Sequence, residues 1–196
     1  MVDAARVDRP EPGRSDAGLL PPTGSARSIP VYQRCFRHAT DLFTVEIPGP
    51  GRISTMARPR GGDWLRDEMA ALAGAGVDVL VCALTGPERD ELDLVDEEME
   101  ARAAGLRFVA IPIPDRTVPE LAAILPDLRG LVGMLRDGAH VVTHCRAGIG
   151  RSSLLAAALL VLGGTDPDAA WGAIGRARGL AVPDTAEQRA WTAGLR

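Results

Sequence analysis

The sequence contains no lysine, and its 22 basic residues are all arginine. Its 26 acidic residues bring the formal net charge to −4, and the chain has no basic tail or stripe. Surfaces for DNA or RNA concentrate positive charge, so the composition does not support a nucleic-acid partner. Long hydrophobic runs are also missing. The run from Leu154 to Leu162 has nine residues, whereas roughly 18 to 20 are needed to span a bilayer.

Cysteine and histidine are sparse, with three of each. Cys35, Cys82 and Cys145 are too few and too scattered for a disulfide scaffold, and the histidines show no zinc-binding spacing. The first 30 residues lack the basic segment followed by an apolar one that marks a secretory signal. We therefore expect a cytoplasmic protein with reduced thiols, no bound metal and no other cofactor.

The composition is that of a soluble globular protein, with 46% hydrophobic and 24% charged residues. A chain of this length buries one sizeable core but is short for two domains. Residues 1–30 mix Pro, Gly, Asp, Arg and Ser with little periodicity, so we expect a disordered N-terminal tail there. Residues 31–196 are expected to form the single folded domain.

Strand and helix signals alternate along this domain. Residues 43–47 and 52–56 flank a Pro-Gly turn and predict an N-terminal β-hairpin. The later strands are expected at residues 77–84, 107–113 and 140–144, and the helices at 64–75, 94–104, 120–136, 152–162, 167–178 and from about 184. This alternation predicts the α/β class, with a central, mostly parallel sheet flanked by helices on both faces. Functional sites in such folds lie at the carboxyl ends of the strands.

Three of these helices have recognisable starting residues. Asp63 is a good N-cap for the first helix, and Asp166 followed by Pro167 predicts a capped start for the helix that ends at Arg178. Thr185 and Gln188 are spaced like a capping box at the start of the last helix.

The segment VVTHCRAGIGRSS, residues 141–153, places Cys145 at the end of a predicted strand and Arg151 at the start of a predicted helix. A backbone that curls between them brings its N–H groups together at the positive end of the helix dipole, where phosphate binds. Gly148 and Gly150 allow positive φ angles and a close approach to the ligand. Arg151 can close over the anion with two hydrogen bonds.

Cys145 shares this environment. Thiols beside amide dipoles and arginines have pKa values of about 3.5–7.5 instead of about 8.5, so we expect Cys145 to be an ionised nucleophile at neutral pH. Ser152 can donate a hydrogen bond to the sulfur and help it leave when a covalent intermediate is hydrolysed. The expected phosphate-binding loop consists of Arg146, Ala147, Gly148, Ile149, Gly150 and Arg151.

Residues 144–152, HCRAGIGRS, resemble the signature His-Cys-x5-Arg-Ser/Thr of cysteine-dependent protein tyrosine and dual-specificity phosphatases. The resemblance runs from about Ile53 to Gln188, and Val81–Leu92 with the segment IPIPDRTVP looks most similar to the cyclin-dependent-kinase-associated phosphatase type. It implies a dual-specificity-like phosphatase fold. It also implies Cys145 as the nucleophile of a phosphocysteine mechanism, Arg151 as the phosphate ligand and the loop amides as oxyanion donors.

The family also needs a general acid for the leaving group, drawn from a loop after the preceding strand. Asp115 stands 30 positions before Cys145 and follows the predicted strand 107–113, so the resemblance makes it the acid and, in the second step, the base. Asp93 and Asp96 are less well placed alternatives. Gln188 corresponds to a polar residue that positions the hydrolytic water, although a capping role is equally open.

The resemblance suggests further roles with ordinary alternatives. His144 organises the loop and shields the sulfur, and a role as catalytic base is the less favoured interpretation. Arg116 either contacts substrate or is a solvated surface residue. Cys82 either traps oxidised Cys145 as a reversible disulfide or is a small buried core thiol. The acidic run 88–100 is typical of a solvated helix face, and it can also repel acidic substrates or dock a basic partner.

The function expected from these residues is hydrolysis of phosphotyrosine in proteins, and of phosphoserine or phosphothreonine as a further activity. Residues 31–196 would then be a phosphatase catalytic domain, with a phosphorylated protein as its partner. One alternative is a phosphoinositide or small-molecule phosphatase, which the loop disfavours because only Arg146 adds charge to it. Others are a pseudophosphatase that binds without turnover, and sulfur transfer on a rhodanese-like loop, which requires neither Arg151 nor an upstream acid. The sequence does not specify the oligomeric state.

Overall fold

The fold is known from a computed structural model that describes residues 41–195. These residues belong to one compact unit built around a five-stranded sheet with the order β1-β2-β5-β3-β4. Strand β1 (Phe43–Val45) pairs antiparallel with β2 (Arg52–Ala57), which confirms the N-terminal hairpin. The remaining pairs, β2 with β5, β5 with β3 and β3 with β4, are parallel. The expected α/β class with a mostly parallel sheet is confirmed.

The elements alternate along the chain as the sequence predicts. The other strands are β3 (Val79–Cys82), β4 (Arg107–Ala110) and β5 (His140–Cys145). The helices are η1 (Gly62–Trp64), α2 (Leu65–Gly74), α3 (Gly86–Glu91), α4 (Glu97–Ala103), α5 (Leu121–Arg136), α6 (Arg151–Leu162), α7 (Pro167–Arg178) and α8 (Ala186–Ala193). The expected tail at residues 1–30, and Cys35 with it, lie outside the described residues.

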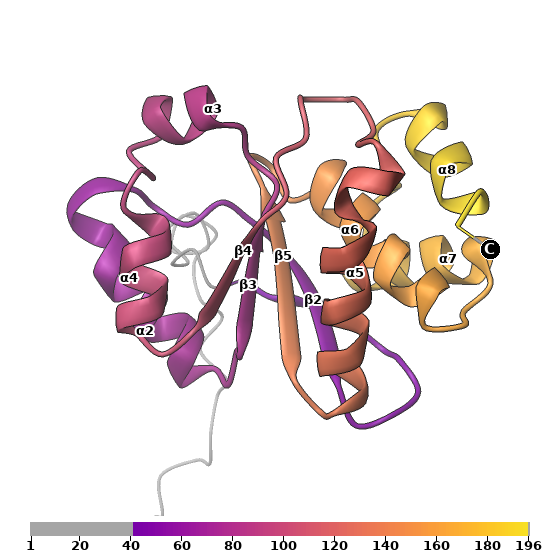
Figure 1. Cartoon of the computed structure of the whole chain (residues 1–196), viewed down its shortest axis with the longest axis horizontal. Helices are drawn as coiled ribbons and strands as arrows, with labels where there is room; N and C mark the ends of the chain where they lie inside the picture. Colours follow the sequence, from indigo (N-terminus) through magenta and orange to yellow (C-terminus); the bar gives the residue numbers. More distant parts are fainter. Residues whose placement is uncertain (1–40, 196) are drawn as a thin grey trace, which may run out of the picture. The chain divides into compact units, whose positions relative to one another are not determined.

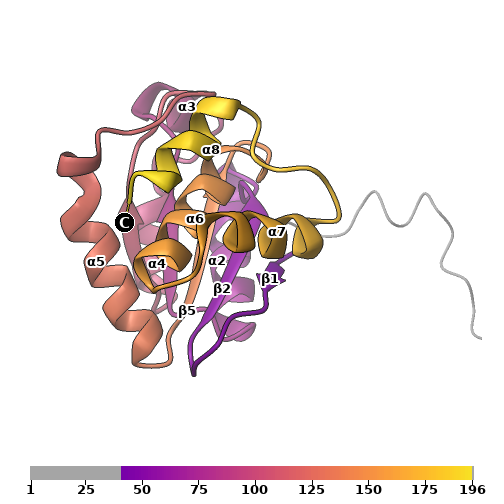
Figure 2. The ribbon, with the colours of Figure 1, turned by 90° about the vertical axis from the view of Figure 1, so that its right-hand side faces the viewer.

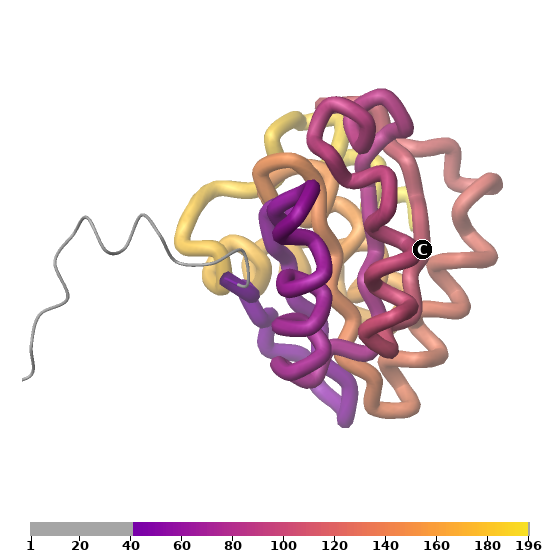
Figure 3. The backbone as a smooth tube through the Cα atoms, turned by 90° about the vertical axis from the view of Figure 1, so that its left-hand side faces the viewer, coloured from indigo at the N-terminus to yellow at the C-terminus, as the bar shows by residue number. Residues whose placement is uncertain are grey.

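Helices cover both faces of the sheet (Figure 1). α5, α6, α7 and α8 lie on one face, which Figure 2 shows from the front, while α2 and α4 cover the other, which faces the viewer in Figure 3. Each face has its own hydrophobic cluster. One includes Val141, Leu154 and Trp171, and the other includes Leu72 and Leu80. The sheet is therefore buried on both sides, as its apolar strands require.

Helix α6 occupies the centre of its layer. Its residues from Arg151 to Val161 are all buried, because it packs against the sheet and also against α5, α7 and α8. This burial explains why its sequence, RSSLLAAALLVL, is apolar all round and has no amphipathic pattern. The signature segment is thus anchored to the most enclosed helix of the fold.

Two boundaries differ from the sequence prediction. The helix expected at residues 94–104 is present as the slightly shorter α4, whereas the preceding helix α3 is absent from the prediction; Asp93 between them adopts a positive φ of 54°. Asp63 does not cap the first helix, because it lies inside the 3-10 turn η1 that precedes α2. In contrast, Asp166 accepts hydrogen bonds from the N–H groups of Asp168 and Ala169, which confirms the predicted cap of α7.

Within the described residues, none of the helices combines the length and the apolarity that crossing a membrane would require.

Candidate active site

The signature segment lies at the carboxyl edge of the sheet, between the central strand β5 and helix α6. Cys145 is the last residue of β5, and its strand is flanked by two parallel neighbours, β2 and β3. Arg151 is the first residue of α6. Residues 145–151, called the signature loop below, therefore connect the middle of the sheet to the start of the buried helix. This is the position where α/β folds bind ligands.

The backbone N–H groups of the signature loop are available to a ligand. Among the hydrogen bonds of residues 41–195, none has the backbone N–H of residues 146–150 as its donor. The loop is held by its carbonyl groups instead: the N–H of Arg58 donates to the oxygen of Arg146 at 3.4 Å. Unpaired amides at the N-terminus of a 12-residue helix favour an anion.

The two glycines of the loop serve different purposes. Gly148 has a φ of 73°, and a Cβ there would lie 2.6 Å from the backbone of Met56 and Ala57 in β2. Gly150 has a φ of −81°, so the expectation of a positive φ is wrong at this position. A Cβ at Gly150 would instead collide with the carboxylate of Asp184. Gly148 therefore requires glycine both for its conformation and for its close packing against backbone, whereas a side chain at Gly150 meets only the movable side chain of Asp184.

The guanidinium of Arg151 is held in place by groups of the protein. Its side chain is only 2% exposed. Nη1 donates to Glu88 Oε2 at 2.7 Å and to the carbonyl of Ile113 at 2.9 Å, and Nη2 donates to Glu88 Oε1 at 2.8 Å. This bidentate pairing, mainly through the hydrogen bonds from Arg151, lowers the pKa of Glu88 from 4.5 to about 2. The guanidinium therefore has a permanent counterion and a fixed orientation.

The sulfur of Cys145 lies beside a hydroxyl. Sγ is 3.5 Å from Ser152 Oγ, and Ser152 is itself fully buried in the first turn of α6. The backbone of that turn is fixed to the strand, because Thr143 Oγ1 donates to the carbonyl of Ser152 at 2.9 Å. The strand and the helix thus hold Cys145 and Ser152 together, as the sequence predicts.

Asp115 reaches the signature loop from the connection between β4 and α5. Its Oδ1 lies 3.2 Å from Arg151 Nη2, while its side chain is 66% exposed. Asp115 belongs to a tight turn in which both the N–H and the hydroxyl of Thr117 donate to the carbonyl of Pro114. Arg116 in this turn adopts a positive φ of 60°, which is uncommon for a residue other than glycine. The acidic partners of Arg151 are Glu88 and Asp115, and not the alternative acids Asp93 and Asp96.

Gln188 connects the last helix to this turn. It is fully buried, and its Nε2 donates to the carbonyl of Thr117 at 3.2 Å. Its backbone N–H donates to Thr185 Oγ1, so Thr185 caps α8 as predicted. The side chain of Gln188 does not complete a capping box, because it reaches to Thr117 and leaves Oε1 without a protein partner.

Two further arginines, one within the signature loop and one beside it, have partners in the protein. Arg146 forms a bidentate pair with Glu91, with Nη2 at 2.6 Å from Oε2 and Nη1 at 3.1 Å from Oε1. Arg178 stacks on the ring of Phe43 at 3.8 Å and donates through Nη2 to the carbonyl of Ala147 at 3.5 Å. Burial lowers the pKa of Arg178, and the nearby Cys145 partly offsets this.

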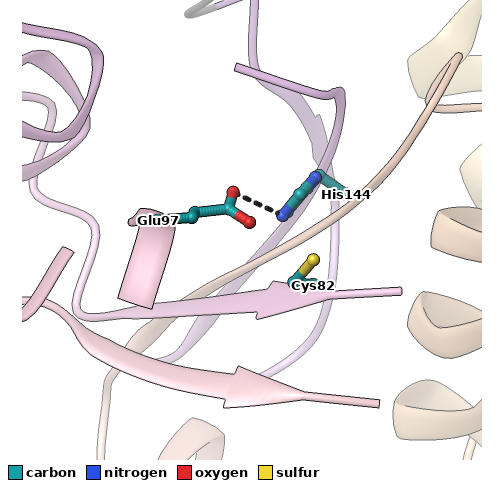
Figure 4. A group of neighbouring side chains, drawn as sticks. All are labelled: Cys82, Glu97 and His144. Carbon is teal, nitrogen blue, oxygen red and sulfur yellow. Dashed lines mark ion pairs between the residues drawn. The ribbon is translucent and has the colours of Figure 1, made fainter. Parts of the chain in front are cut away.

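His144 points away from the signature loop, to the face of the sheet that α4 covers (Figure 4). Its Nε2 lies 2.9 Å from Glu97 Oε1, and both side chains are fully buried. Burial opposes a charged imidazole, but the carboxylate of Glu97 and the neighbouring Cys82 outweigh it and raise the pKa of His144 well above 6.5. We therefore describe Glu97 and His144 as a buried ion pair beneath the loop. No contact supports His144 as a base in the site.

Cys82, Glu97 and His144 also form the one group in the described residues whose ligand atoms could hold a metal ion, all within 4.8 Å of one another. Their donor types suit zinc. All three side chains are enclosed, however, and the Glu97–His144 contact already neutralises two of them. The arrangement is thus explained by charge pairing without a metal.

Cys82 and Cys145 are both free thiols. Cys82 is in register with His144, so its side chain lies on the α4 face, whereas the sulfur of Cys145 lies among residues of the α6 face. A disulfide between them would require the end of a strand to turn. The redox pairing therefore stays a prediction, and the structure shows Cys82 as a partner of Glu97 and His144.

The site roles of Glu88, Glu97 and Arg178 are absent from the sequence prediction. The expectation that residues 88–100 form a solvated helix face is wrong for Glu88, which pairs with Arg151, and for Glu97, which is fully buried. Glu88 had one local signal, because Thr85 and Glu88 have capping-box spacing and do form a capping box at the start of α3. That signal locates a helix start but not the pairing with Arg151. Glu97 and Arg178 had no local signal, because each meets the loop region only through the tertiary fold.

Sequence comparison identifies relatives of the chain. Residues 54–165, more than half of the chain, match the family described as "Polymorphic toxin system, DSP-PTPase phosphatase". A protein of Invertebrate iridescent virus 6, "Putative tyrosine phosphatase 197R", is 27% identical over 117 residues. The match covers 58% of this chain and 42% of the viral protein, so the chain spans less than half the length of that relative.

Solved structures show the same fold. A kinase associated phosphatase (KAP) with its catalytic cysteine replaced by serine superposes with a TM-score of 0.69 at 18% identity, covering 79% of this chain and 93% of that one. Tk-PTP in its active form gives a TM-score of 0.61 at 27% identity, covering 78% and 95%. The expected similarity to the kinase-associated type is confirmed for the fold. With the signature loop, the family match and these folds in agreement, the chain belongs to the DSP-PTPase phosphatases of polymorphic toxin systems.

Proposed function

We propose that this chain is a cysteine-dependent phosphomonoesterase that hydrolyses phosphotyrosine in proteins, with phosphoserine and phosphothreonine as further substrates. The observation that carries the proposal is the convergence of three groups at one edge of the sheet. Cys145 ends the central strand, Arg151 begins the next helix, and Asp115 lies 3.2 Å from Arg151. A nucleophile, an anion ligand and a proton donor are what transfer of a phosphoryl group to an enzyme requires.

In the first step, the thiolate of Cys145 attacks phosphorus and forms an S–P bond. The bond from phosphorus to the leaving oxygen breaks, and its electron pair stays on that oxygen. Asp115 donates the proton that makes the leaving group an alcohol or a phenol. The loop amides and Arg151 bind the phosphoryl oxygens and stabilise their charge.

In the second step, water attacks phosphorus and the S–P bond breaks, returning its electron pair to the sulfur. Asp115, now a carboxylate, accepts a proton from the water. Gln188 would hold this water, because its buried Oε1 lacks a protein partner and its Nε2 is fixed to the turn that carries Asp115. Ser152, at 3.5 Å from the sulfur, would donate a hydrogen bond that stabilises the departing thiolate.

The proposal includes residues 31–196 as the catalytic domain and a phosphorylated protein as the partner. It also requires Cys145 in the reduced state, which a reducing compartment such as the cytoplasm provides. No step needs a metal ion, because Arg151 and the loop amides supply the charge stabilisation and Asp115 the proton transfer.

A second candidate is a phosphatase for phosphoinositides or other small phosphate esters. The charge of Arg146 is the feature of the loop that would favour it, but the carboxylate of Glu91 neutralises this charge. A pseudophosphatase that only binds phosphate is less well supported, because both Cys145 and Arg151 are present.

The test is turnover of a chromogenic aryl phosphate, a phosphotyrosine peptide, phosphoserine and phosphothreonine peptides and a phosphoinositide by the full chain and by Cys145→Ser. We expect hydrolysis by the wild type, with the phosphotyrosine peptide as the best physiological type of substrate. We expect no turnover by Cys145→Ser, although it still binds vanadate. Turnover by this variant at the wild-type rate would exclude Cys145 as the nucleophile, and vanadate binding without any wild-type turnover would indicate a pseudophosphatase.

A further inference from the structure

The guanidinium of Arg146, the residue next to the nucleophile, is fully engaged by helix α3. Two of its nitrogens pair with the two carboxylate oxygens of Glu91 at 2.6 and 3.1 Å. The third, Nε, lies 3.8 Å from Glu88 Oε1. All three guanidinium nitrogens of Arg146 thus face carboxylates of α3 and not the centre of the signature loop. Arg146 is the only basic residue of this loop besides Arg151.

Glu91 has no evident role in the fold. It is the last residue of α3, and its side chain is 63% exposed. Within residues 41–195 its hydrogen-bond partner is Arg146, whose hydrogen bonds and charge lower the pKa of Glu91. An exposed pair of this kind contributes little to stability. We therefore look for its effect on the charge at the entrance to the site, called the mouth below, where Glu88, Glu91, Asp115 and Arg146 lie.

We propose that Glu91 determines substrate selectivity by keeping Arg146 paired, so that the site accepts an isolated phosphomonoester and rejects substrates with a second phosphate beside the scissile one. This inference rests on the proposed function and specifies the substrate class of the same site. It covers a neighbouring phosphate on a peptide and one on an inositol ring, because both present the same dianion at the mouth.

The other charges at the mouth support this selectivity. Glu88 and Asp115 both lie within 4 Å of Arg151, so one side of the site is lined by carboxylates. Arg178 is turned to the carbonyl of Ala147 and to the ring of Phe43. A second phosphate that approaches α3 must therefore displace Glu91 from Arg146 or accept its repulsion. Rejection by an unfavourable charge is a common source of specificity.

The test compares Glu91→Gln with the wild type on matched substrates. These are one peptide with phosphotyrosine alone, the same peptide with a second phosphorylated residue beside it, and inositol headgroups with one and with two phosphates. We expect the ratio of kcat/KM for doubly to singly phosphorylated substrates to rise about threefold to tenfold, the effect of one exposed charge interaction. The rise should shrink at high salt, which screens exposed charges.

Two control variants separate this effect from others. Glu98→Gln removes one exposed carboxylate from α4, where it pairs with Arg102, and should leave the ratio unchanged. Glu91→Gln combined with Arg146→Gln should lose the gain, because the freed cation is then missing. A rise of the kcat/KM ratio for the peptides alone, or for the inositol headgroups alone, would support the inference and show which type of second phosphate Glu91 excludes.

The inference and the proposed function fail in distinguishable ways. Active enzymes with equal ratios in wild type and Glu91→Gln would overturn the inference and leave the phosphatase intact. Absence of turnover in both proteins would overturn the proposed function. The inference would then be tested by binding: the affinities of Cys145→Ser and of the double variant Cys145→Ser/Glu91→Gln for the same peptides would be compared. Equal affinities there would overturn it as well.

Discussion

The side chains of Arg151 and Glu88 meet in a bidentate pair, with N–O distances of 2.7 and 2.8 Å, although 63 positions separate them in the sequence. Helix α3 and helix α6 are thereby joined across the carboxyl edge of the sheet. Because Arg151 is the proposed phosphate ligand, Glu88 acts on catalysis through Arg151 and is a positioning residue.

Replacing Glu88 with Gln should weaken both the fold and the site. The amide would place an NH2 group against a guanidinium donor, leaving a largely buried hydrogen bond unmade at a cost of about 1–3 kcal/mol. We expect a lower free energy of unfolding in urea and a lower kcat/KM. Glu98→Gln removes a carboxylate from an exposed pair on α4 and should change neither, which provides the control.

The same pair predicts how stability depends on pH. The pKa of Glu88 falls from 4.5 to about 2 in the folded chain, so its stabilising contribution is present above pH 4.5 and is lost as the pH falls towards 2. Melting temperatures of wild type and Glu88→Gln should therefore differ most above pH 4.5 and approach each other between pH 4.5 and 2. A constant difference over this range would contradict the prediction.

Asp115 should matter most for poor leaving groups. A positioned general acid contributes about 10²- to 10⁴-fold when the departing oxygen needs a proton. We expect Asp115→Asn to lower kcat by about that factor with phosphoserine peptides, and much less with a nitrophenyl phosphate. Asp127→Asn, which makes the same change at an exposed carboxylate of α5, is the control. An equal loss with both leaving groups would mean that Asp115 does not donate the proton.

Gly148 and Gly130 provide a matched comparison of glycine substitutions. Alanine at Gly148 has to adopt a φ of 73° and meets the backbone of β2, so Gly148→Ala should lose more than about 1–2 kcal/mol of stability and most activity. A Cβ at Gly130 in α5 meets nothing within 4 Å. Gly130→Ala should therefore gain about 0.5–1 kcal/mol with unchanged activity, as measured by urea unfolding and turnover.

The buried Glu97–His144 pair predicts an opposite pH dependence. The raised pKa of His144 means that its contribution is complete below pH 6.5 and is lost as the pH rises through the value in the folded chain. Glu97→Gln should leave an unpaired charge at a cost of about 3–5 kcal/mol and lower the pKa of His144. NMR titration of the imidazole measures this shift, and an unchanged titration would show that Glu97 is not its counterion.

Much of this fold follows from local patterns in the sequence. The alternation of apolar strands and helices predicts the α/β sheet, and Asp166 with Pro167 predicts the start of α7 because capping depends on neighbouring residues alone. Helix α3 escapes such patterns, since its six residues, GPERDE, show no apolar period, and Asp93 after it takes its positive φ only in the folded turn. Boundaries that depend on tertiary packing cannot be derived from composition.

The site divides in the same way. Cys145, Arg151 and Ser152 are predicted because the loop that joins them is continuous, and Asp115 is predicted because it follows a strand whose end lies at the same edge of the sheet. Glu88, Glu97 and Arg178 reach the loop region from separate elements, so their roles depend on distances that no spacing encodes. Gln188 combines both situations. The hydrogen bond from its backbone N–H to Thr185 is local and follows from the sequence, but the hydrogen bond from its side chain to Thr117 joins residues 71 positions apart.

The complete enclosure of α6 affects how mutagenesis of this protein is interpreted. From Arg151 to Val161 no position faces solvent, so a scan of this helix has no inert site to serve as a baseline. A variant of this helix loses activity either because the reaction is impaired or because the core no longer packs, and turnover alone does not separate the two causes. Each variant in the helix therefore needs its own measurement of folded fraction before its turnover can be assigned to the reaction.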